Sequence, residues 1–177
     1  MISRKSNAVF VAFATILLGL FSAQAGGDKV AFPENYAKGV KWLVVDKPQF
    51  KRIHEYYATP DALEAARKNQ PMPEGTVFVG AQYQIQLNGQ GNPVLGPDGH
   101  FIKANLSGYI VMQKHAGWGA EYPPELRNAE WEYQIFKADK TPNKDVKLTA
   151  CFECHKPFAS QDYVQKYDKL KGADTKQ

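Results

Sequence analysis

Residues 76–87 have the sequence TVFVGAQYQIQL. One set of alternate positions is apolar or aromatic throughout, from Val77, Val79 and Ala81 to Leu87. The positions between them hold Phe78, Gly80 and then three glutamines. Successive side chains of a β-strand point to opposite faces of its sheet, so every second residue shares a face. The pattern therefore predicts a β-strand with one buried face.

Further strands are predicted on both sides of this stretch. Residues 52–58, 106–114 and 130–136 are rich in aromatic and branched side chains, which suit strands. Between them, residues 88–99 contain several glycines and prolines and predict a turn-rich loop. Because the strands after residue 76 follow one another without a crossover helix, we expect an antiparallel sheet.

Helices are predicted around this sheet. Thr59-Pro60-Asp61 supplies an N-cap, a proline at the first helical position and an acidic first turn for a short helix over residues 62–68. Residues 32–46 predict a short helix or an extended lead-in. Ser160 is a candidate cap for a closing helix. The apolar stripe of that helix would be Tyr163, Val164, Tyr167 and Leu170. The fold class is therefore α+β, a central antiparallel β-sheet with short flanking helices.

The first 25 residues predict a secretory signal peptide. Arg4 and Lys5 precede an apolar run over residues 8–21, and the small-residue pattern Ala23-Gln24-Ala25 follows. The run is shorter than the roughly 20 residues that span a membrane, which favours cleavage over anchoring. We therefore expect residues 26–177 to form a single domain that is soluble in the periplasm.

The charge pattern argues against two classes of partner. The chain has a net charge of +4, and removal of Arg4 and Lys5 with the signal peptide lowers it further. No dense basic run interrupts the mixed charges, so nucleic acid and, after signal cleavage, membrane surfaces are not expected as partners.

The only two cysteines of the chain lie in the string CFECH, residues 151–155, which is the c-type haem attachment motif. Thiols separated by two residues on a helical turn can reach both vinyl groups of one porphyrin, and the next residue places an imidazole under the iron. Cys151 and Cys154 are therefore predicted to bind one haem c, with His155 as the ligand of its iron.

Three other interpretations of this string are weaker. A disulfide between Cys151 and Cys154 would close a short, strained ring and would leave His155 as a coincidence. A thioredoxin-like pair belongs after an early strand of a βαβ unit, and a zinc site needs further ligands at regular spacing.

A second axial ligand would decide the chemistry of the iron, because a filled position suits electron transfer and an open one binds small molecules. The sequence offers five candidates, namely Met72, Met112, His54, His100 and His115. Met112 lies in an apolar strand pattern that favours core packing. Met72, between two prolines, could either ligate the iron in an electron carrier or fill a loop.

The order of several segments resembles the cytochrome P-460 family, which includes the cytochromes c-prime beta. These segments are residues 32–36 with Trp42, residues 57–60, residues 73–77, residues 131–133 and residues 149–155. The resemblance implies a sheet-rich homodimer whose haem lacks a distal protein ligand and whose members bind or transform nitrogen oxides. It also implies a small nitrogen-oxide ligand and is compatible with a redox partner protein.

The resemblance also separates two branches of the family. Its hydroxylamine-oxidising enzymes carry a lysine bonded covalently to the porphyrin, and this lysine should fall at or near Gly80, where the chain has none. The chain is therefore more similar to the c-prime beta branch, which binds nitric oxide above an apolar distal pocket. Phe78 shares a strand face with Gly80 and is a candidate for that pocket or for the core, and Phe101 and Phe136 are further candidates.

Three functions follow as hypotheses from these observations. The first is binding of nitric oxide or a related species at an open distal position. The second is oxidation of hydroxylamine, which the missing lysine disfavours. The third is electron transfer with Met72 as the second ligand.

Overall fold

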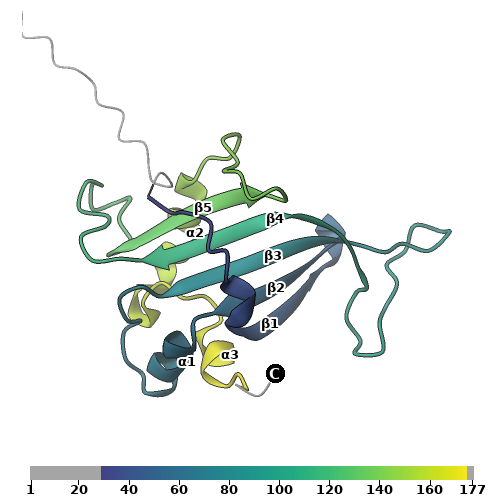
Figure 1. Cartoon of the computed structure of the whole chain (residues 1–177), viewed down its shortest axis with the longest axis horizontal. Helices are drawn as coiled ribbons and strands as arrows, with labels where there is room; N and C mark the ends of the chain where they lie inside the picture. The colour runs from purple at the N-terminus through teal and green to yellow at the C-terminus, as the bar shows by residue number, and fades with distance from the viewer. Residues whose placement is uncertain (1–28, 175–177) are drawn as a thin grey trace, which may run out of the picture.

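The computed structural model of the chain describes residues 29–174, so the predicted signal peptide lies outside the described residues. Five strands form one antiparallel sheet in the order β1-β2-β3-β4-β5, in which sequence neighbours are also neighbours in space (Figure 1). The strands are β1 (Val40–Lys47), β2 (Arg52–Ala58), β3 (Val77–Ile85), β4 (Lys103–Lys114) and β5 (Trp131–Lys137). The predicted α+β class and antiparallel sheet are confirmed.

Short helices flank the sheet. They are α1 (Pro60–Arg67), α2 (Thr149–His155), α3 (Tyr167–Lys171) and the 3₁₀ helices η1 (Tyr36–Lys38), η2 (Pro48–Phe50) and η3 (Lys156–Gln161). In Figure 1, α2 lies behind the sheet, whereas the N-terminal segment crosses in front of it. Among the described residues, no helix is long and apolar enough to cross a membrane.

The face of the sheet that packs against α1, α2 and α3 is called here the helix face. From β3 it carries Phe78, from β4 Met112, and from β5 Trp131 and Tyr133. These side chains form one buried cluster with apolar residues of the three helices, including Leu63, Phe152 and Leu170. Burial of this apolar surface is the main force that docks the helices on the sheet.

The opposite face, called here the N-terminal face, is covered by the segment that precedes β1. Val79, Tyr109 and Phe136 of the sheet pack there against Val30 and Phe32. The sequence predicted one buried face for the β3 strand, but Phe78 and Val79, on opposite faces, are both buried. The prediction fell short because a covering segment from outside the strand is not visible in the strand's own alternation.

Three local predictions are corrected by the structure. Residues 32–46 contain the short helix that was one alternative, η1, but from Val40 onward they form strand β1 rather than a lead-in. Thr59 takes the N-cap position of α1 but makes no side-chain capping hydrogen bond. Ser160 lies inside η3 and caps nothing, because the left-handed residues Asp162, Tyr163 and Lys166 interrupt the helical path and α3 begins only at Tyr167.

Candidate functional site

Helix α2 presents the two cysteines and the histidine of the CFECH string. Cys151 and Cys154 are three residues apart and therefore share one helix face. Both are free thiols; Cys154 is exposed and Cys151 is partly buried. Burial raises the pKa of the Cys151 thiol to about 11, so this group is protonated at neutral pH.

Phe152 anchors the other side of α2 in the core. Its side chain is 1% exposed and packs edge-on against Tyr133 and Tyr122, with ring centroids 4.7 and 5.5 Å away. The side-chain amide of Asn128 donates to both the Phe152 carbonyl and the Tyr133 hydroxyl at 3.0 Å. These contacts fix the rotation of α2, so that Phe152 points inward while Cys154 stays accessible.

The imidazole of His155 is oriented by a backbone carbonyl. Its Nδ1 lies 2.7 Å from the carbonyl oxygen of Tyr163. A carbonyl can only accept, so Nδ1 carries the proton and Nε2 retains a lone pair. Burial lowers the pKa of His155, against the opposing effect of the Tyr163 carbonyl, and thus favours the neutral form. Neutral imidazole with a free Nε2 is the form that binds metals.

A row of residues across the middle of the helix face has little free space. The strand register aligns Tyr56 of β2, Gly80 of β3, Ile110 of β4 and Ile135 of β5. A Cβ atom at Gly80 would lie 2.7 Å from Cγ1 of Ile110 and 2.9 Å from Cε1 of Tyr56. The neighbours of Gly80 thus occupy the volume that a side chain at this position would need.

The aromatic candidates from the sequence lie in three different places. Phe78 is buried on the helix face, where its ring packs near Trp42 and Trp131 at 6.2 and 5.9 Å. It belongs to the buried cluster against which Cys151 packs. Phe136 lies on the N-terminal face against Phe32, at 5.2 Å, on the opposite side of the sheet from α2, so the distal-pocket role considered for it gains no support. The backbone amide of Phe101 donates to Asp46 instead, at 3.1 Å.

The candidates for a second ligand are each engaged elsewhere. Met72 is 2% exposed, and Met112 is a core residue of β4. Nδ1 of His54 lies 3.2 Å from the Tyr56 hydroxyl. His100 and His115 pair with Asp46 and Glu74, both at 2.9 Å. Within residues 29–174, no three side chains of the His, Cys, Asp or Glu types gather in a way that could hold a metal ion.

Sequence reasoning missed three contributors to this site. The Tyr163 carbonyl is a main-chain group, and the Asn128 amide comes from a loop. Neither contact follows from a sequence pattern. Tyr56 was predicted to lie in a strand. Its position opposite Gly80 depends on how β2 pairs with β3, which the sequence alone does not show. A surface hollow of about 390 Å³ lies away from α2, between η1 and the ends of β2 and β3, and includes none of the CFECH residues.

Comparison with known protein families identifies the family of this chain. A comparison with curated proteins gives no match. The family model described as Cytochrome P460 matches residues 33–166, a span that includes the whole sheet and the CFECH helix. The match covers well over half of the chain, and the chain therefore belongs to the cytochrome P460 family.

Proposed function

We propose that this chain is an exported c-type cytochrome, with one haem attached through Cys151 and Cys154 in a single domain over residues 26–177. Membership of the cytochrome P460 family implies haem binding. In the proposal His155 is the iron ligand, and the opposite, open position of the iron binds nitric oxide or a related nitrogen oxide. The product would work in the periplasm, with a small nitrogen-oxide ligand and a redox protein as partners.

The hydrogen bond between His155 Nδ1 and the Tyr163 carbonyl, at 2.7 Å, is the observation that carries this proposal. It orients the ring, sets the tautomer and leaves Nε2 for a metal, as the outer partners of metal-bound histidines do. In the same helix, two free thiols on one face supply the atoms for two thioether bonds.

A further feature fits a bound haem. Trp42 belongs to the helix-face cluster, and its Nε1 is buried without a hydrogen-bond partner among residues 29–174. Haem carboxylates are acceptors that such a donor could use.

Each group of the chain has a distinct role in this proposal. When bound, the haem iron supplies a redox-active centre whose affinity for small ligands depends on its axial ligand and surroundings. Cys151 and Cys154 would hold the cofactor, and His155 would supply the iron ligand. Apolar side chains on the helix face, among them Phe78 and Ile110, exclude water and offer few hydrogen bonds to polar ligands, which favours a neutral diatomic.

Hydroxylamine oxidation has less support from this site. The lysine that the family's enzymes bond to their porphyrin is replaced by Gly80, and the space at this position is filled by Ile110 and Tyr56. We expect haem-loaded protein to consume no hydroxylamine with an artificial electron acceptor. Electron transfer through Met72 is also disfavoured, because its side chain is packed in the core.

Absorption spectroscopy tests the proposal. The purified haem-loaded protein should have a five-coordinate spectrum in both oxidation states, and its ferrous form should bind nitric oxide. A charge-transfer band between methionine and ferric iron would contradict it, as would a spectrum that changes on the Met72→Ala substitution.

A further inference from the structure

The turn that carries the Tyr163 carbonyl has an unusual backbone. Asp162 and Tyr163 are consecutive non-glycine residues with left-handed φ values of 50° and 63°. Left-handed conformations are unfavourable for most L-residues and persist where the surroundings enforce them. The contacts that hold this turn therefore control where the carbonyl points.

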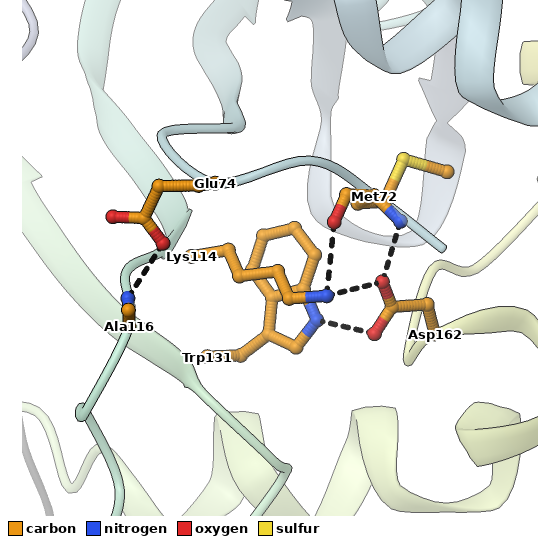
Figure 2. A network of polar contacts seen from close by, with 6 residues as sticks. All are labelled: Met72, Glu74, Lys114, Ala116, Trp131 and Asp162. Carbon is orange, nitrogen blue, oxygen red and sulfur yellow. Dashed lines mark hydrogen bonds and ion pairs between the residues drawn. The ribbon is translucent and has the colours of Figure 1, made fainter. Parts of the chain in front are cut away.

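The carboxylate of Asp162 ties the turn to the sheet and to the loop after α1. Its Oδ1 accepts from the indole Nε1 of Trp131 at 3.0 Å. Its Oδ2 accepts from the ammonium group of Lys114 at 2.8 Å and from the backbone amide of Met72 at 2.7 Å. Figure 2 shows these donors converging on the one carboxylate.

The network is closed on itself and largely shielded from water. The Lys114 ammonium also donates to the Met72 carbonyl at 3.0 Å, and the side chains of Lys114 and Asp162 are only 12% and 14% exposed. Hydrogen bonds to charged groups in such surroundings are stronger than neutral ones. The position of Asp162 is thus set by rigid strands β4 and β5 rather than by its own loop.

Backbone hydrogen bonds pass this constraint to the next residue. The amide of Asp162 donates to the Ala159 carbonyl at 3.2 Å, and the amide of Tyr163 donates to the Phe158 carbonyl at 2.8 Å. With both amides fixed and the Asp162 side chain anchored, the peptide after Tyr163 directs its carbonyl toward His155.

We propose that Asp162 is a positioning residue for the iron ligand: it fixes the Tyr163 carbonyl against His155 Nδ1 and thereby sets the reduction potential of the haem. The inference rests on the proposed function, in which His155 binds the iron. A hydrogen bond from Nδ1 makes the imidazole a more basic ligand, and a more basic ligand stabilises ferric over ferrous iron. Loosening the turn should therefore raise the midpoint potential.

Asp162→Asn is the direct test. Asparagine keeps the shape of the side chain and tolerates the left-handed region, but its amide nitrogen cannot accept from Lys114 or from the Met72 amide. We expect full haem loading, a higher midpoint potential and a lower iron–histidine stretching frequency in the resonance Raman spectrum of the ferrous protein. Potential and stretching frequency report on the iron bond rather than on stability.

Asp46→Asn is the matched control. Asp46, in β1, also accepts from a backbone amide, that of Phe101, and contacts a ring nitrogen, Nδ1 of His100. We expect this variant to leave both the potential and the stretching frequency unchanged. An equal shift in the two variants would show a general effect of charge and would overturn the inference.

Lys114→Met provides a second route if the asparagine variant does not fold. It removes one donor of Asp162 and leaves two, so a smaller shift in the same direction is expected. An unchanged potential in the folded, haem-loaded variants overturns the role of Asp162. Wild-type protein that takes up no haem would instead overturn the proposed function, so the two failures are distinguishable.

Discussion

The two faces of the sheet are closed by different means. On the N-terminal face, the ring of Phe32 packs edge-on against Tyr109 and Phe136, at 4.7 and 5.2 Å, and Glu55 pairs with Lys103 at 2.8 Å. On the helix face, α2 brings two free thiols and a histidine with an unused nitrogen. One face thus serves stability through side-chain contacts, whereas the other retains groups with the capacity to bind a cofactor.

The largest difference between the two faces is expected when the thiols of α2 are removed. The double substitution Cys151→Ala and Cys154→Ala leaves no atom for a thioether bond, so we expect complete loss of covalent haem. Haem-dependent peroxidase staining after denaturing electrophoresis measures this. The N-terminal-face variant Phe136→Ala is the control and should remain stained. Persistent staining of the double variant would place the attachment elsewhere.

A pair of phenylalanine truncations compares the faces directly. Phe78 and Phe136 are both buried, and each change to alanine should lower the free energy of unfolding by about 3–5 kcal/mol. We expect only Phe78→Ala to alter nitric oxide binding by the ferrous protein, because Phe136 lies on the far face. Urea denaturation and stopped-flow absorbance separate the two effects. Equal changes in nitric oxide binding would remove Phe78 from the distal pocket.

Gly80 tests how tightly the middle of the helix face is filled. The Cβ of Gly80→Ala would lie 2.7 Å from Cγ1 of Ile110, and we expect a loss of about 1–3 kcal/mol in the free energy of unfolding from overpacking. Gly89→Ala is the matched control, because its Cβ meets no atom within 4 Å. Thermal or urea denaturation of both variants measures the difference, and equal stabilities would show that Ile110 and Tyr56 yield easily.

A smaller effect on stability is expected from acid, through His54 and Glu55, neighbouring residues of β2 whose side chains point to opposite faces of the sheet. Burial, with the nearby charges of Lys47 and Arg52, lowers the pKa of His54 from 6.5 to about 4. Between pH 6.5 and about 4, His54 is therefore protonated in the unfolded chain but neutral in the folded chain, so the free energy of unfolding falls as the pH drops through this range. His54→Gln should reduce this fall, as measured by urea denaturation at several pH values.

Glu55 gives the corresponding acid response on the N-terminal face. Burial alone would raise its pKa, but the hydrogen bond and charge of Lys103, with Lys41 and Tyr57, bring the pKa below the usual 4.5. Its contribution to stability is present above pH 4.5 and is lost as the pH falls through the lower, folded-state pKa. Glu55→Gln should therefore flatten the pH curve only below pH 4.5, whereas His54→Gln already acts from pH 6.5 downward. Flattening by Glu55→Gln between pH 6.5 and 4.5 would contradict the assignment.

Local sequence patterns revealed the parts of the molecule that depend on local periodicity. Alternation placed β3 and β5, aromatic and branched residues placed β4, and the CFECH string located the candidate attachment helix. Pro60 and Asp61 marked the start of α1 as expected. These features follow from the two-residue period of strands and from residue preferences within one turn of helix.

The remaining features depend on distant contacts that no local pattern encodes. Phe136 was considered for the distal pocket, but the register of β5 turns it toward Phe32, on the face opposite α2. The closing helix exists as α3 but begins at Tyr167 rather than after Ser160, and the turn before it is held by contacts of Asp162 with Lys114 and Trp131, which lie far away in the sequence. The same long-range contacts shape the turn that orients His155, so the sequence did not reveal how the Tyr163 carbonyl is held against that ring.

The central claim is that Cys151 and Cys154 carry one haem in thioether linkage. Intact-mass measurement of the denatured protein, produced in a host with haem-attachment machinery, tests it most directly. The expected result is the mass of the polypeptide plus one haem, with the added mass confined to the peptide that contains residues 151–155. Folded protein with the mass of the bare polypeptide would contradict the claim.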